Sequence, residues 1–198
     1  AHPLASEAGV EILERGGNAF DAAVAVSAAL GVVEPDASGL GGYGQMVAYL
    51  TDLEAPVVIE FLTRAPQEAT LENAALNNAT GPMLANVPGV VRGMELAFDK
   101  YGSGQIEWAR LIEPAIRAAT EGFVLDDAFT TTLAHERARY GPWDSSMELF
   151  FPNGEPLKAG DLFKNPDLGW TLKEIAEGGG DAFYEGEIAK EIARYSKE

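Results

Sequence analysis

The longest apolar stretch of the chain covers residues 19–33, where almost every position is small or aliphatic. A helix with this composition is apolar around most of its circumference, which is typical of helices inside a protein. Asn18 or Asp21 can cap its first turn by accepting hydrogen bonds from free backbone N–H groups, and Pro35 ends it. The pattern therefore predicts one central buried helix around which the other elements pack.

Six other segments carry apolar residues at the three- and four-residue spacing of a helix face. Glycines follow several of them, as is typical of helix C-termini. We predict helices over residues 3–15, 90–101, 106–121, 126–139, 165–178 and 186–195. The buried faces of three of them are expected to hold Leu4, Ala8, Ile12 and Leu13; Trp108, Leu111, Ile112, Ala115 and Ala119; and Leu168, Leu172, Ile175 and Ala176.

Two short runs rich in aliphatic and aromatic residues predict β-strands over residues 45–51 and 57–61, separated by a turn at 52–56. Their spacing predicts a hairpin. Residues 64–88 are polar, irregular and rich in Ala, Asn and Thr, which indicates a long excursion over the surface or beside a pocket. The expected order is thus helix, helix, strand, strand and then further helices.

Composition and charge indicate the general class of the protein and exclude some kinds of partner. With 198 residues, 46% of them hydrophobic, the chain is expected to be globular, and no repeat or linker divides residues 1–198. The 31 acidic and 14 basic residues give a formal charge of −17, which repels phosphate backbones and anionic lipid. No run reaches the roughly 20 apolar residues that a membrane-spanning helix needs. We therefore expect neither nucleic acid nor a membrane as a partner.

The metal and cofactor motifs of the chain are weak. It has no cysteine and only two histidines, His2 and His135, so we expect no metal site. Residues 39–44 satisfy the G-x-G-x-x-G pattern of dinucleotide sites, but these glycines leave a helix and enter a strand, the reverse of the required context. Residues 130–132 are threonines near His135, but they fall within a predicted helix, which favours a surface or packing role over nucleophilic catalysis. No cofactor is expected.

Several blocks of the sequence, in consistent order and spacing, resemble the gamma-glutamyltranspeptidase family. They cover essentially the whole chain, which makes chance agreement improbable. The matching blocks are His2–Gly9, Gly16–Ala19, Asp21–Ala25, Glu34–Pro35, Ser38–Gly42, Asn86–Gly93, Glu113–Ile116, Asn165–Leu168, Thr171–Leu172, Ile175–Ala176 and Ala182–Ala189.

The resemblance implies an α+β fold, the four-layer αββα sandwich of the N-terminal-nucleophile hydrolases, with residues 1–198 as a single domain fragment at its N-terminal end. Members of the family are made as a precursor that cleaves itself into a large and a small subunit, and the threonine that begins the small subunit is the nucleophile. This chain matches only about the first half of the large subunit, so no catalytic residue is expected in it. The implied partners are the rest of the large subunit, the small subunit that carries the threonine, and a small-molecule substrate.

One substrate-binding residue of the family is expected in this chain. A D-G-R-E-T-A-P segment after the second strand supplies the arginine that binds the α-carboxylate of the γ-glutamyl group in the family. The corresponding segment here runs from Glu60 to Pro66, with Leu62 at the arginine's place and Arg64 two positions later. Residues two apart in an extended segment point to the same face, so Arg64 would reach the pocket at a displacement of about 7 Å. Either Arg64 binds a differently placed carboxylate, or it forms a local ion pair, for example with Glu60 or Glu68.

The resemblance implies an enzyme that cleaves γ-glutamyl amides such as glutathione through an acyl-enzyme on a threonine outside the chain, as a gamma-glutamyltransferase or glutathione hydrolase does. The displaced arginine keeps open a related acylase that acts on glutaryl or cephalosporin-type amides. A non-catalytic scaffold fragment without the nucleophile portion is a further alternative. The sequence does not distinguish among the cytoplasm, the periplasm and secretion for a soluble protein of this kind.

Overall fold

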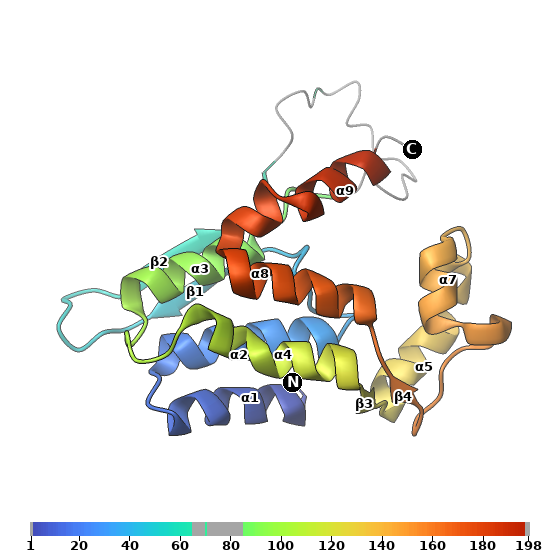
Figure 1. Ribbon diagram of the computed structural model, residues 1–198, viewed down its shortest axis with the longest axis horizontal. Coiled ribbons are helices and arrows are strands. Elements are labelled where there is room, and N and C mark those ends of the chain that lie inside the picture. The colour runs from blue at the N-terminus through green and yellow to red at the C-terminus, as the bar shows by residue number, and fades with distance from the viewer. Residues whose placement is uncertain (1, 65–69, 71–84, 197–198) are drawn as a thin grey trace.

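Helix α2 (Ala19–Val33) lies at the centre of the molecule (Figure 1). The structure is a computed structural model that describes residues 2–64, 70 and 85–196. Nine of the fifteen residues of α2 are buried, so the central buried helix predicted from its composition is confirmed.

A reciprocal capping box fixes the start of α2. The side-chain oxygen of Asn18 accepts hydrogen bonds from the amides of Phe20 and Asp21, and Asp21 Oδ2 accepts one from the amide of Asn18 at 2.9 Å. The same two side chains reach a distant segment, because Asn18 Nδ2 donates to the carbonyl of Tyr101 at 2.7 Å and the amide of Ser103 donates to Asp21 Oδ2 at 3.0 Å. Both predicted capping residues are therefore confirmed, and they also tie two parts of the chain together.

Three further helices stack in layers around α2: α1 (Pro3–Glu14), α4 (Trp108–Glu121) and α8 (Pro166–Tyr184). Helices α1 and α4 pack against α2, and α8 packs against α4 on the far side (Figure 1). The inner face predicted for α4 is confirmed, since Leu111, Ile112, Ala115 and Ala119 are buried and Trp108 is partly buried.

The buried face predicted for α1 is wrong at Leu13, whose side chain is 50% exposed. The helix instead turns Gly9 toward α2, where an added Cβ would meet the side chain of Val26 at 2.7 Å. The absence of a side chain at Gly9 thus lets the two helices approach closely, and Leu13 is rotated toward solvent.

Strands β1 (Gly44–Ala48) and β2 (Val57–Phe61) form the predicted antiparallel hairpin, with Gly44 opposite Phe61 and Ala48 opposite Val57. β1 ends three residues earlier than predicted because the chain turns after it, with the amide of Leu53 donating to the carbonyl of Leu50 at 3.1 Å.

The two faces of the hairpin differ in their surroundings. Helix α3 (Val90–Tyr101) packs against one face, which carries the buried side chain of Ile59. On the other face Val47 and Val58 lie opposite each other, and they are 63% and 54% exposed. This chain therefore leaves one side of its hairpin uncovered by the residues that the structure describes.

A cluster of aromatic rings organises the other end of the molecule. The elements there are β3 (Phe123–Val124), α5 (Asp127–His135), α6 (Arg137–Tyr140), α7 (Asp144–Phe150), a 3₁₀ turn (Pro152–Gly154) and β4 (Leu162–Phe163), and β3 pairs antiparallel with β4. The rings of Phe123, Phe129 and Phe150 surround Phe163 at centroid distances of 5.7, 6.4 and 5.7 Å. Helix α9 (Glu187–Tyr195) follows α8 and lies on the opposite side from α1 (Figure 1).

Two of the predicted helices differ in the structure, and one further helix was not predicted. The helix predicted over residues 126–139 divides at Glu136, which separates α5 from α6, and α7 was not predicted. The helix predicted to end at residues 178–180 is interrupted there, since Gly179 adopts a non-helical φ of +63°, but a further short helical segment up to Tyr184 was not predicted. Of the segment predicted as irregular, residues 65–69 and 71–84 lie outside the described residues.

Within the described part of the chain, no helix combines the length and apolar character needed to cross a membrane.

Candidate functional site

A groove of about 410 Å³ lies between the end of β2 and the start of α3. The end of β2 and the residues that follow it form one wall, and the segment before α3 forms the other together with the first two turns of that helix. The first wall holds Glu60, Phe61, Leu62 and Arg64, and the second holds Val87, Pro88, Gly89, Arg92, Gly93 and Leu96.

Close backbone packing brings these two walls together. A Cβ on Gly89 would lie 2.3 Å from the carbonyl oxygen of Phe61, and a Cβ on Gly93 would lie 2.3 Å from the Phe61 ring. Two glycines on one side of α3 therefore allow it to lie directly on β2. The amides of Gly89 and Val90 both donate to the carbonyl oxygen of Gly42, at 2.9 and 3.2 Å.

Arg64, the predicted substrate-binding residue, lies in this groove with Leu62 beside it. Its side chain is exposed, and it forms no ion pair or hydrogen bond with any residue among 2–64, 70 and 85–196. The local ion pair with Glu60 is therefore absent, although Glu60 lines the same groove, and Glu68 lies outside the described residues. Arg64 thus offers a guanidinium that no described carboxylate neutralises.

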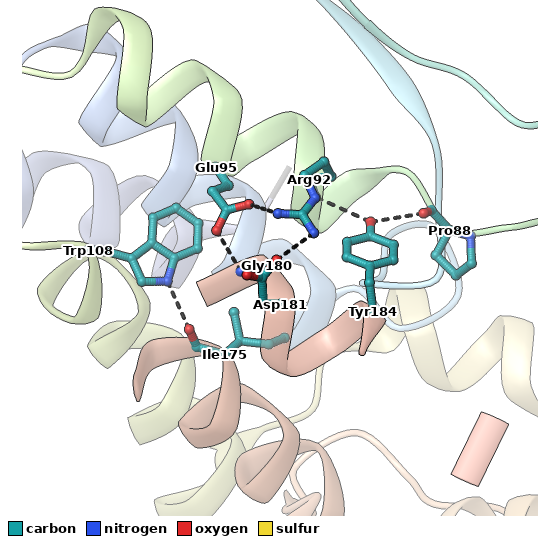
Figure 2. Close-up of polar contacts among 8 residues, drawn as sticks. All are labelled: Pro88, Arg92, Glu95, Trp108, Ile175, Gly180, Asp181 and Tyr184. Carbon is teal, nitrogen blue, oxygen red and sulfur yellow. Dashed lines mark hydrogen bonds and ion pairs between the residues drawn. The ribbon is translucent and has the colours of Figure 1, made fainter. Parts of the chain in front are cut away.

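Arg92, the second arginine of the groove, is already engaged by carboxylates (Figure 2). Its Nη1 donates to Glu95 Oε2 at 2.5 Å and its Nη2 donates to Asp181 Oδ1 at 2.9 Å. The hydrogen bond with Asp181, with further support from Glu95, raises the pKa of Arg92 above its ordinary value. Glu95 Oε1 also accepts from the amide of Gly180 at 2.6 Å. Arg92 and Glu95 therefore join α3 to the part of α8 that follows the kink.

The hydroxyl of Tyr184 makes a second connection between α8 and the groove (Figure 2). It donates to the carbonyl of Pro88 at 2.9 Å and accepts from the amide of Arg92 at 3.2 Å. Burial raises the pKa of Tyr184 above its ordinary value, while the hydrogen bond from the Arg92 amide acts in the opposite direction. The hydroxyl therefore keeps its proton at neutral pH and remains a donor.

Comparison with known proteins identifies the family. The gamma-glutamyltranspeptidase family matches residues 5–198. The chain belongs to this family. It is 39% identical to the glutathione hydrolase proenzyme of Bacillus subtilis strain 168 over 98% of this chain and 34% of that protein. It thus spans about a third of the length of the curated relatives it matches.

Two solved structures confirm the fold expected from the resemblance. The gamma-glutamyltranspeptidase of Helicobacter pylori superposes with a TM-score of 0.92 at 38% identity, over 98% of this chain and 57% of that one. The cephalosporin acylase of Bacillus halodurans superposes with a TM-score of 0.89 at 28% identity, over 98% of this chain and 38% of that one. The α+β class, with this chain as the N-terminal part of the four-layer N-terminal-nucleophile hydrolase sandwich, is therefore confirmed.

The other candidate motifs have structural explanations within this family fold. The glycines at 39–44 form a turn that leads into β1, and Gly42 anchors the start of α3. His135 is exposed, and its Nδ1 lies 2.7 Å from the carbonyl of Thr131 one helical turn earlier. In the described part of the chain, no group of three or more His, Asp or Glu side chains is placed to hold a metal ion.

Sequence reasoning did not identify Arg92, which lines the groove, or Tyr184, whose hydroxyl bonds residues of its wall. Both stand in blocks that resemble the family, but the hydrogen bond between them joins residues 92 positions apart. Such a pairing leaves no local pattern in a single sequence, because periodicity and capping signals extend over only a few residues.

Proposed function

We propose that the protein to which this chain belongs is a gamma-glutamyltranspeptidase-like enzyme that cleaves γ-glutamyl amides such as glutathione. The observation that carries the proposal is Arg64, an exposed guanidinium that forms no ion pair with any described residue and lines a groove beside β2. Guanidinium groups bind carboxylates by paired, charge-assisted hydrogen bonds, so Arg64 fits the free carboxylate of the γ-glutamyl group.

In the proposed reaction, a threonine outside residues 1–198 supplies the nucleophile. Its hydroxyl adds to the γ-carbonyl carbon while its α-amine takes the hydroxyl proton, and the amine product leaves with a proton as the C–N bond breaks. Water or the amino group of an acceptor then attacks the resulting ester and releases the γ-glutamyl product. The reaction uses no metal or cofactor.

The partners of residues 1–198 in this proposal are the rest of a large subunit and a small subunit that begins with the threonine. Two observations support them: the chain spans about a third of its curated relatives, and the relative from Bacillus subtilis is named a proenzyme. Residues 1–198 then form a single fragment at the N-terminal end of the large subunit.

Substitution of Arg64 tests the proposal. In the full-length protein, Arg64→Ala should raise the KM for a γ-glutamyl anilide about 10- to 100-fold, because a hydrogen bond to a charged group contributes about 1.5–3 kcal/mol. Steady-state kinetics measure this change. The matched control is Arg110→Ala, which removes the same charge from an exposed arginine of α4 that does not line the groove.

If Arg64→Ala and Arg110→Ala give the same KM as the unsubstituted protein, Arg64 does not bind the donor and the site assignment is wrong. Absence of any turnover by the unsubstituted full-length protein on γ-glutamyl and glutaryl amides would leave the scaffold alternative in place of the enzyme.

A second candidate is an acylase that acts on glutaryl or cephalosporin-type amides. It is favoured by Leu62, which occupies the position where the family carries its carboxylate-binding arginine. A glutaryl group has the same terminal carboxylate as a γ-glutamyl group but lacks its α-amino group. The ratio of kcat/KM for matched γ-glutamyl and glutaryl amides therefore distinguishes the two candidates.

A further inference from the structure

The first turn of α3 has no cap of the usual kind. A helix begins with backbone N–H groups that find no partner within the helix, and Ser, Thr, Asp or Asn at the N-cap normally accepts from one of them. Gly89 is the N-cap of α3 and has no side chain with which to do so.

Packing prevents any such residue at this position. The Cβ of a residue at position 89 would lie 2.3 Å from the carbonyl oxygen of Phe61, which belongs to the backbone of β2 and is held by the hairpin. A local cap is therefore incompatible with the close contact between α3 and β2 that forms the groove.

The hydroxyl of Tyr184 takes the place of the missing cap. It accepts from the amide of Arg92, the third residue of α3, which is the amide that an N-cap side chain usually serves. It also donates to the carbonyl of Pro88, which directly precedes the N-cap. One hydroxyl from α8 thus binds both sides of the Pro88–Gly89 segment that forms a wall of the groove (Figure 2).

The Tyr184 ring is itself held in place. The guanidinium of Arg92 lies over it at 5.0 Å from the centroid, and Phe183 contacts it edge to face at 5.0 Å. Arg92 in turn is fixed by Glu95 and Asp181, so the position of the hydroxyl is determined by contacts on both α3 and α8.

We propose that Tyr184 is a positioning residue whose hydroxyl fixes the wall of the groove opposite Arg64 and thereby sets the affinity for the carboxylate of the acyl donor. The inference rests on the proposed function of Arg64, because it concerns the same groove. Without the hydroxyl, the Pro88 carbonyl and the Arg92 amide lose their partner and the first turn of α3 loosens. The hydrogen bonds from Gly89 and Val90 to Gly42 remain, so α3 still forms.

The test is Tyr184→Phe in the full-length protein, which removes the hydroxyl and keeps the ring. We expect the KM for a γ-glutamyl anilide to rise about five- to tenfold, from the loss of two hydrogen bonds, with kcat within twofold. This split is the kinetic signature of weakened donor binding, whereas a purely structural role would leave KM unchanged. Tyr195→Phe is the matched control, since Tyr195 on α9 is partly exposed and its hydroxyl bonds no described residue.

Arg64→Ala, measured in parallel, separates this inference from the proposed function. A raised KM in Arg64→Ala but not in Tyr184→Phe supports the site and overturns the positioning role of Tyr184. A raised KM in Tyr184→Phe but not in Arg64→Ala supports the role of the wall and overturns the assignment of Arg64.

Hydrogen exchange tests whether the Tyr184 hydroxyl caps α3, and it can be measured even if neither γ-glutamyl nor glutaryl amides are turned over. The amide of Arg92 should exchange at least tenfold faster in Tyr184→Phe than in the unsubstituted protein, while Tyr195→Phe leaves it unchanged. An unchanged exchange rate at Arg92 in Tyr184→Phe overturns the inference.

Discussion

Asp21 shows how one side chain can join distant parts of this chain. It is fully buried, and its Oδ2 accepts from the amide of Asn18 in its own helix and from the amide of Ser103, 82 residues later. Its Oδ1 has no hydrogen-bond partner among the described residues. Asp21 therefore acts as a cap and as a long-range connection at the same time.

Removal of this carboxylate should be costly. Asp21→Ala leaves two partly buried amides without an acceptor, so we expect the free energy of unfolding to fall by about 2–4 kcal/mol. Chemical denaturation of the full-length protein measures it. Asp127→Ala is the control, because Asp127 stands in the first turn of α5, is exposed and bonds no described residue through its side chain, so its loss should cost below about 1 kcal/mol. Equal losses for the two variants would contradict the role of Asp21.

Single residues also mark the limit of what the sequence predicts about the site. Arg64 was identified because the segment that holds it has a recognisable counterpart in the family, and the structure places it in the groove. The contact of Tyr184 with the wall of that groove was not predicted, because it depends on α8 bringing the hydroxyl to the start of α3. The sequence thus indicates where Arg64 lies through its own segment, but it carries no signal for a contact between distant helices such as that of Tyr184.

Among the elements, α3 lies directly on β2 because Gly89 has no side chain. Gly89→Ala would place a Cβ against the backbone of β2, so we expect the free energy of unfolding to fall by about 1–3 kcal/mol, and the groove to widen. Gly41→Ala is a matched control, because a Cβ at Gly41 meets nothing within 4 Å and the residue has no positive φ. Gly41→Ala should be neutral or stabilising by up to about 1 kcal/mol. Thermal unfolding of both variants decides whether the contact with Phe61 constrains position 89.

The sequence predicted elements well where local signals agree and poorly where tertiary packing decides. α2 and β2 begin and end where composition and turn residues place them, and Asn165 caps α8 as predicted. The glycines at 178–180 interrupt α8 at Gly179 as expected, but the helical segment after the kink and the hydrogen bond from the amide of Gly180 to Glu95 were not predicted. No periodicity in the sequence reports such a contact, since Glu95 is 85 residues away from Gly180.

At the scale of the whole molecule, the uncovered face of the hairpin agrees with a chain that is one part of a four-layer sandwich. In that fold two sheets pack face to face, so we expect Val47 and Val58, which are exposed in residues 1–198, to lie between the two sheets of the full-length protein. Val47→Asp should therefore lower the free energy of unfolding of the full-length protein by at least about 2 kcal/mol, although Val47 is exposed in residues 1–198.

Val10→Asp provides the comparison for that substitution. Val10 lies on the outer face of α1 and is exposed to a similar degree, but α1 belongs to an outer helical layer. Its substitution should change the free energy of unfolding by no more than about 0.5 kcal/mol. If Val47→Asp is as mild as Val10→Asp, the face remains on the surface of the full-length protein.

Because the residue that caps α3 lies far along the chain, the helix is synthesised well before its cap. The ribosome adds about 5–20 residues per second, and Tyr184 lies 92 residues after Arg92, so the cap arrives about 5–20 s after the amide that it serves. Through that interval the nascent α3 is held by its anchor on Gly42 and by its packing against α2 and β2, which precede it in the chain. A chain whose translation stops before Tyr184 keeps the helix but never acquires its cap, and is correspondingly open to proteases at this turn.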